Sequence, residues 1–219
     1  MTLAIYGHPF SSYTQKALIA LYENGLRFEF RMIGPETPEN YDRLKRAWPL
    51  AKFPLLDDGG THVFEATSII EYLHLKHPGA VHLIPDDRDT MIEARMLDRV
   101  FDNYVMTPMN AIVRNALRAP ESRHAPSVAE ARAQLDAIYG WLDQRMAGRT
   151  WAVGEAFTLA DCAAAPSLFY ADWAHPFPPA LVHLRRYRQR LLARPSYDRA
   201  NDEARPYRHY FPLGAPDRD

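Results

Sequence analysis

The chain has 219 residues, of which 47% are hydrophobic and 24% are charged, a composition typical of a globular protein with a sizeable core. Its 26 Lys and Arg residues almost balance its 27 Asp and Glu residues, so we expect neither nucleic acid nor a membrane surface as a partner. No stretch approaches the roughly 20 apolar residues of a membrane span, and the N-terminus lacks a basic leader. The only cysteine, Cys162, cannot form an intramolecular disulfide, which fits the cytoplasm.

The first part of the sequence interleaves strand patterns with helical ones. Residues 3–6 predict a buried strand, and residues 13–24 carry apolar side chains at helical spacing. Alternation over 28–32 predicts a half-buried strand, and residues 53–64, with a turn rich in Asp and Gly inside them, predict a hairpin. A helix over about 66–77 follows. The order βαβ, then a loop or irregular helix, then ββα predicts an α/β domain with a mixed sheet.

Strand signals end after this point. Residues 78–87 contain turn formers without a period, and they predict a linker. Four stretches with apolar residues at helical spacing follow the linker: 89–117, 127–147, 158–173 and 180–194. We therefore expect a domain over 1–77 and, over 88–219, an all-α helix bundle with a tail.

Four segments carry a family resemblance by their order and spacing. They are GHPFSSYTQKAL after the first strand, AKFPLL at the hairpin, FEATSIIEYL at the third helix and TLADCAAAP late in the bundle. The chain resembles the cytosolic glutathione transferases over residues 3–205, and among them the serine-type, bacterial theta-, zeta- or nu-like members. The resemblance implies a thioredoxin-like domain that holds glutathione and a helical domain that shapes a second-substrate pocket.

The segment AKFPLL matches the part of the family that binds the glutathione backbone. In the family the proline is cis, so that the preceding residue pairs with the cysteinyl backbone as an added strand would. Pro54 and Phe53 are the matching positions. The alternative for Pro54 is an edge-strand proline. Lys52 matches residues that meet the glycyl carboxylate, and it is equally well interpreted as a solvated loop lysine.

The segment FEATSIIEYL matches the seat of the γ-glutamyl group, because a helix N-terminus offers free N–H groups and the positive end of a dipole. Glu65 matches the acidic residue that meets the glutathione amino group; its alternative is an acid favoured by the helix dipole alone. The family usually has Ser next. This chain has Ala66, which removes a hydrogen bond worth about 1 kcal/mol, and Thr67 offers a replacement hydroxyl.

Catalysis is expected in the loop after the first strand. The thiol of glutathione has an unperturbed pKa of about 8.5, so a transferase must stabilise the thiolate. A hydroxyl at a helix N-terminus does so by its hydrogen bond and by the dipole. The resemblance implies Ser11 as the catalytic serine, with Ser12 as the neighbour that could take the role. Either could also be only an N-cap.

The second-substrate pocket is expected between this loop and the start of the bundle. The resemblance points to Tyr13, Tyr104 and Met109, a lining able to adapt to apolar electrophiles, although the same residues could be ordinary core. No metal site is expected, since His74 and His77 lack an evident third ligand.

These features predict a glutathione S-transferase that uses glutathione as co-substrate and attacks a small, apolar electrophile. A glutathione-dependent isomerase, dehalogenase or peroxidase of the same fold stays open as an alternative. A non-catalytic glutathione-binding module also stays open, with Ala66 as its only hint. Cysteine-type chemistry is disfavoured because residues 1–80 contain no cysteine. Family members are usually two-fold dimers, so the resemblance implies a homodimer.

Overall fold

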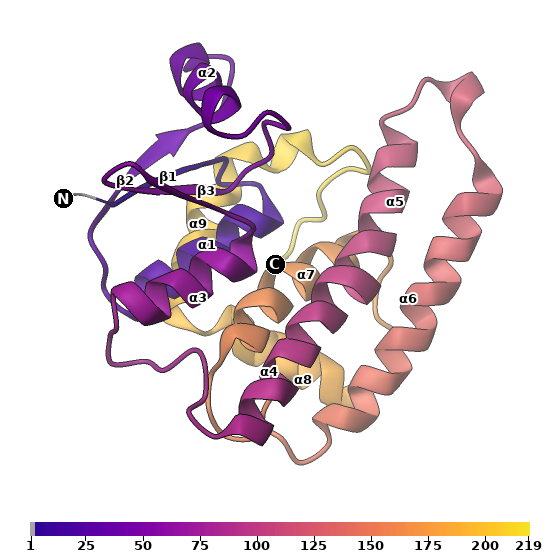
Figure 1. Ribbon diagram of the computed structural model, residues 1–219. Coiled ribbons are helices and arrows are strands. Elements are labelled where there is room, and N and C mark those ends of the chain that lie inside the picture. Colours follow the sequence, from indigo (N-terminus) through magenta and orange to yellow (C-terminus); the bar gives the residue numbers. More distant parts are fainter. Residues whose placement is uncertain (1–2) are drawn as a thin grey trace.

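The computed structural model describes residues 3–219 as an α/β layer followed by a set of helices (Figure 1). The elements of the α/β layer are β1 (Leu3–Gly7), α1 (Ser12–Glu23), β2 (Phe28–Met32), α2 (Pro38–Ala47), β3 (Leu55–Asp58), β4 (Thr61–Phe64) and α3 (Ala66–Lys76). The predicted order is confirmed, and α2 occupies the place of the loop or irregular helix.

The four strands form one mixed sheet in the order β2-β1-β3-β4. Strand β1 pairs in parallel with β2, from Leu3 opposite Phe28 onward. Strand β3 is antiparallel to both β1 and β4. The mixed sheet expected from the sequence is therefore confirmed, and the parallel pair is joined by the α1 crossover.

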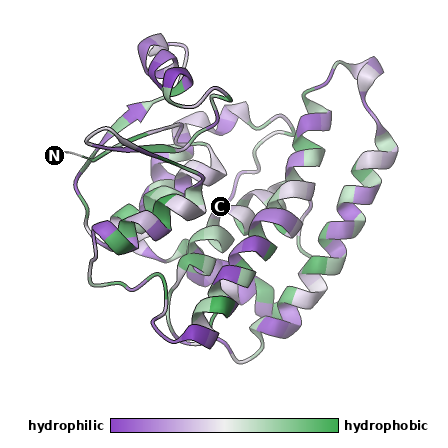
Figure 2. Cartoon of the chain, in the orientation of Figure 1, coloured by the Kyte–Doolittle hydropathy of each residue, from purple (hydrophilic) through white to green (hydrophobic). Residues whose placement is uncertain are grey.

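Side chains alternate between the two faces of the sheet, and different helices pack on each face. Ile5 and Leu56 belong to the main core with α1 and α3, whereas Tyr6 and Leu55 pack with Leu44 of α2. Figure 1 shows α1 and α3 on one face and α2 on the other. Figure 2 shows that α2 is mostly hydrophilic, and Leu44 is the residue that it buries. The main core therefore extends from the α1 side of the sheet into the helical part.

The second part is helical throughout, as predicted, and residues 77–87 connect it to α3. Its elements are α4 (Arg88–Val100), the π-helical turn η1 (Phe101–Met106), α5 (Thr107–Ala116), the short η2 (Pro120–Ser122), α6 (Ala125–Met146), α7 (Leu159–Ala174), α8 (Val182–Leu192), α9 (Pro195–Ala204) and the 3₁₀ helix η3 (Arg205–Tyr210). Over residues 3–219, none of these helices is both long enough and apolar enough to span a bilayer.

Helix α7 is the centre of this part and is buried along its whole length. It begins with a capping box, in which Thr158 Oγ1 accepts from Ala160 N at 3.3 Å and Asp161 Oδ2 accepts from Thr158 N at 2.8 Å. Asp161 Oδ1 also accepts from Ala152 N at 2.8 Å and from the Tyr187 hydroxyl at 2.6 Å. The Asp161 carboxylate therefore joins the start of α7 to the preceding loop and to α8.

The loop after β1 is fixed by side chains from both parts of the molecule. Gln15 Nε2 donates to Pro9 O at 3.0 Å and to Tyr170 Oη of α7 at 3.1 Å. The Tyr170 hydroxyl donates in turn to Phe10 O at 3.1 Å. This loop leads directly into α1, so the helical part sets the position of the α1 N-terminus.

Candidate active site

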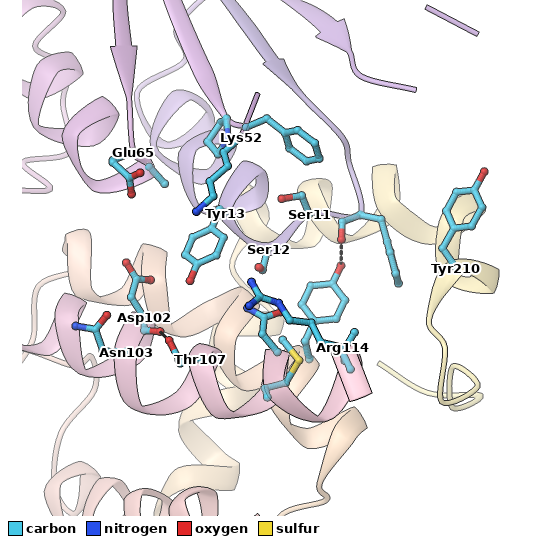
Figure 3. A pocket seen from close by; sticks show the side chains of 18 of the residues that line it. Ser11, Ser12, Tyr13, Lys52, Glu65, Asp102, Asn103, Thr107, Arg114 and Tyr210 are labelled. Atoms are coloured by element: carbon cyan, nitrogen blue, oxygen red, sulfur yellow. Dashed lines mark hydrogen bonds between the residues drawn. The ribbon is translucent and has the colours of Figure 1, made fainter. Parts of the chain in front are cut away.

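A cavity of about 700 Å³ lies between the N-termini of α1 and α3 on one side and η1, α5 and the C-terminal segment on the other (Figure 3). This volume suits a small-molecule ligand. Many of its lining residues come from the segments singled out in the sequence: Ser11, Ser12, Tyr13, Lys52, Phe53, Pro54, Glu65, Ala66 and Met109. Thr67 and Tyr104 are not among the lining residues.

Ser11 is the N-cap of α1, and Ser12 is the first residue of the helix. Ser11 has extended backbone angles (φ −88°, ψ 122°), and its Oγ accepts from Thr14 N at 3.3 Å. A serine hydroxyl has one donor and two acceptor sites, so the cap leaves the O–H of Ser11 available to a ligand. Figure 3 shows both serines at the cavity. Capping and anion binding are therefore compatible at Ser11.

The backbone before Ser11 is held in a tight turn. Ser11 N donates to His8 O at 2.9 Å, and Phe10 N donates to His8 Nδ1 at 3.1 Å. The His8 ring also meets the edge of Tyr207, with the ring centroids 4.6 Å apart. Burial lowers the pKa of His8, which favours the neutral ring that this accepting Nδ1 requires.

Two residues on the cavity have backbone angles that L-residues rarely adopt. Glu65 has φ +64° and Ala51 has φ +50°, and within residues 3–219 they are the two non-glycine residues with positive φ. Such conformations cost about 1–3 kcal/mol each and concentrate at functional sites. Between them the Phe53–Pro54 peptide bond is cis, as the family resemblance implies.

The start of α3 differs from that of α7 because it is open to the cavity. Glu65 is the N-cap residue of α3, and its side chain makes no capping hydrogen bond. Ala66, the first helical residue, lines the cavity beside it. A helix start with uncapped N–H groups is a favourable seat for an anion.

A buried polar network lies next to α3 and uses the hydroxyl of Thr67. Lys16 Nζ donates to Thr67 Oγ1 at 2.8 Å and pairs with Asp98 at 2.6 Å and Asp102 at 2.7 Å. Thr67 Oγ1 donates to Asp98 Oδ2 at 2.9 Å, and Arg99 also contacts both residues. The structure thus places Thr67 outside the cavity, where its hydroxyl serves the network and does not replace the hydroxyl that Ala66 lacks.

The helical wall of the cavity carries a polar stripe. Asn103, Thr107, Asn110 and Arg114 line it at spacings of four, three and four residues, which is one face of a helix. Tyr104 lies one position off this face and is 60% exposed, so the structure differs from the expected lining at this residue. Met109, which was predicted for the same wall, does line the cavity.

Tyr13 lines the cavity as expected, from the first turn of α1. Burial, together with the charges of Asp102 and Glu65, raises the pKa of Tyr13 to about 12. Its hydroxyl therefore stays protonated at neutral pH and remains a hydrogen-bond donor.

The C-terminal segment forms the remaining side of the cavity through Tyr210, Phe211 and Pro212. Arg205 pairs with Asp219 at 2.6 Å, and Arg208 pairs with the same carboxylate. These pairs fold the end of the chain back onto η3. The sequence alone does not establish this wall, because a short aromatic tail has no periodicity that fixes where it packs.

Comparisons with known proteins agree with this geometry. The family model for the glutathione S-transferase N-terminal domain matches residues 5–80, and the model for the glutathione S-transferase C-terminal domain matches residues 105–195. A glutathione S-transferase-like protein of a Fusarium species is 30% identical over 71% of this chain and 71% of its own length. A glutathione S-transferase of Hypomyces subiculosus is 25% identical over 94% of this chain and all of its own length.

A solved structure extends the likeness to the fold. A glutathione S-transferase of Methylobacterium radiotolerans, in complex with glutathione sulfonate, is 30% identical to this chain. The two structures superpose over 91% of this chain and 94% of the Methylobacterium chain, with a TM-score of 0.77. With two family domains matched in order and the cis proline and open α3 start in place, the chain belongs to the glutathione S-transferase family.

Proposed function

We propose that this protein is a glutathione transferase in which Ser11 stabilises the thiolate of glutathione for attack on an electrophilic small molecule. The observation that carries the proposal is the position of the Ser11 hydroxyl, at the N-terminus of α1 and on the cavity, with its donor hydrogen unused by the cap.

Thiolate formation is the step that this arrangement assists. The Ser11 O–H donates to the sulfur, and the positive end of the α1 dipole lowers the energy of the anion. Each unit by which the thiol pKa falls corresponds to about 1.4 kcal/mol in favour of the thiolate. The thiol proton passes to solvent, and the sulfur then forms a bond to the electrophilic carbon while the leaving group departs with its electron pair.

The rest of glutathione has a matching set of groups around the cavity. The uncapped start of α3 suits the γ-glutamyl carboxylate, and the Glu65 carboxylate suits the amino group. The backbone of Phe53 suits the cysteinyl unit, and the exposed Lys52 suits the glycyl carboxylate. Ser12 is the second hydroxyl within the same helix turn and is the natural control for Ser11.

The test is the ultraviolet absorbance of bound glutathione thiolate across pH, measured on wild type, Ser11→Ala and Ser12→Ala. We expect wild type to lower the thiol pKa by a unit or more and Ser11→Ala to restore it, with Ser12→Ala resembling wild type. Tight binding with an unshifted pKa would instead identify a glutathione-binding module. A lowered pKa that is lost only in Ser12→Ala would transfer the role to Ser12.

We also propose a homodimer that uses the α3–α4 face, defined by Leu75, Ile92, Met96 and Tyr104. All four are exposed large hydrophobic residues. Ile92, Met96 and Tyr104 follow one another along α4 and η1, and Arg95 of α4 pairs with Glu71 of α3 at 2.8 Å, so the two helices adjoin. An apolar surface of this kind typically marks an interaction site.

Light scattering tests the dimer. We expect wild type to have the mass of two chains and Met96→Glu to have the mass of one chain at micromolar concentration. Val182→Glu, which changes an exposed apolar residue of α8, is the matched control and should remain dimeric. A monomeric wild type, or a dimeric Met96→Glu, would reject this face.

A further inference from the structure

Arg114 of α5 is a cation on the cavity that the protein itself does not neutralise. In the described chain, residues 3–219, no carboxylate lies within ion-pair distance of its guanidinium. Arg99, which also lines the cavity, pairs with Asp98 and Asp102. Figure 3 shows Arg114 reaching from α5 into the cavity toward the side that carries Ser12 and Tyr13. The charge of Arg114 is therefore available to a ligand.

Along α5, the cavity-lining neighbours of Arg114 are uncharged, and the charged residues Arg99 and Asp102 of the same helical wall pair with each other. Met109, Val113 and Leu117 line the cavity on the α5 side, Asn110 lies one helical turn from Arg114, and Phe211 lines it from the C-terminal segment. The opposite wall is the N-terminus of α1, whose dipole is also positive toward the cavity. A ligand with an apolar body and one anionic group matches this compartment better than a wholly apolar ligand.

Glutathione does not require this cation. On the proposed function, its γ-glutamyl carboxylate has the start of α3, its glycyl carboxylate has Lys52, and its thiolate has Ser11. All three groups belong to the α/β layer, whereas Arg114 belongs to the helical wall. The polar stripe that ends at Arg114 thus faces the space left for the second substrate.

We propose that the second substrate is an electrophile that carries a carboxylate on an apolar body, and that Arg114 selects it by pairing with that carboxylate. The inference rests on the proposed function and narrows its substrate class. Arginine suits the role because its planar guanidinium can donate two parallel hydrogen bonds to a carboxylate. The proposal thus revises the prediction of an apolar electrophile to one with an apolar body and an anionic group.

Binding of two conjugates tests the proposal without requiring turnover. The probes are S-(4-carboxybenzyl)glutathione and S-(4-methylbenzyl)glutathione, which differ in one charged group, and the measurement is Kd by calorimetry. We expect wild type to bind the carboxylate conjugate about 10-fold more tightly, and Arg114→Gln to lose this preference. Arg118→Gln, which changes an arginine just after the end of α5 and outside the cavity lining, is the matched control and should keep it. The preference should also decrease with added salt.

Other outcomes overturn the proposal, and they separate it from the proposed function. Equal affinity for the two conjugates in wild type, or a preference that survives Arg114→Gln, rejects the role of Arg114 while glutathione binding stands. An Arg114→Gln protein that binds free glutathione more weakly, or that loses the lowered thiol pKa, places the cation in the glutathione site and rejects substrate selection. Absence of glutathione binding by wild type rejects the proposed function and this inference together.

Discussion

The starts of α7 and α3 solve the same problem in opposite ways. At α7, Thr158 and Asp161 satisfy the free backbone groups inside the protein, and both residues are fully buried. At α3, Glu65 makes no capping hydrogen bond, has a positive φ and faces a cavity. Both helices have four N–H groups without intrahelical partners. The difference shows that one helix start is used for stability and the other is kept available for a ligand.

This comparison separates stability from binding, since the two starts should respond differently to substitution. Changes at Asp161 should lower the free energy of unfolding, and changes at Glu65 or Ala66 should alter glutathione affinity with little effect on unfolding.

Asp161→Ala should lower the free energy of unfolding by about 3–5 kcal/mol, because it leaves several buried donors without an acceptor. Urea unfolding measures the effect. Asp89→Ala, which removes an exposed acid from the first turn of α4, is the control and should stay within about 0.5 kcal/mol of wild type. A loss below about 1 kcal/mol at Asp161 would mean that the capping box is not the stabilising element inferred here.

The pH dependence of stability sharpens the same point. Burial raises the pKa of Asp161 to about 6, outweighing the hydrogen bonds that favour the carboxylate. The folded protein then binds the proton more tightly than the unfolded chain, whose Asp pKa is about 3.9. Stability that is present below about pH 4 should therefore be lost as the pH rises to about 6, by an amount on the order of 1–3 kcal/mol.

Asp161→Asn isolates this contribution, because the variant does not titrate at that position. We expect the free energy of unfolding of wild type, minus that of Asp161→Asn, to fall between pH 4 and pH 6.5. If the difference rises instead, the hydrogen-bond donors around Asp161 favour the carboxylate more strongly than burial disfavours it.

Glu65→Gln should weaken glutathione binding about 10- to 100-fold, since it removes a charge-assisted hydrogen bond to the amino group worth about 1.5–3 kcal/mol. Its free energy of unfolding should change by less than about 0.5 kcal/mol, because the side chain makes no cap in the free protein. Calorimetry gives the affinity, and Glu39→Gln in the exposed part of α2 is the control. Unchanged affinity in Glu65→Gln would remove Glu65 from the site.

Ala66→Ser restores the hydroxyl that the family usually has at this position. We expect it to bind glutathione about fivefold more tightly, in line with a neutral hydrogen bond worth about 1 kcal/mol. Weaker binding by Ala66→Ser would show that this cavity is shaped for alanine and that the ligand carboxylate is already satisfied by the backbone.

Local patterns predicted the fold well because each element carries its own signal. The alternation over residues 28–32 and the apolar run at residues 3–6 mark strands whatever their neighbours are. The capping box at Thr158 and Asp161 is likewise a local signal, since it needs only a spacing of three residues. The resemblance supplied the cis bond at Pro54, which no local pattern could have indicated.

The parts of the site that the sequence left out depend on phase and on long-range contacts. Asn103 and Tyr104 lie in the π-helical turn at Phe101–Met106, which an α-helical pattern does not reveal, and of the two only Asn103 lines the cavity. The spacing of Asn103, Thr107, Asn110 and Arg114 was a readable signal for this face. The hydrogen bond from Lys16 to Thr67 has no such local signal, because 51 residues separate the two partners.

The hydrogen bonds of Tyr170 also have a consequence for protein engineering. Its hydroxyl and Gln15 tie the loop ahead of Ser11 to α7, so the residue proposed to hold the thiolate is positioned by the helical half of the chain. An isolated α/β half would lack this support. A chimera that takes its helices from another transferase, to acquire a new specificity, therefore has to retain a tyrosine at this point of α7.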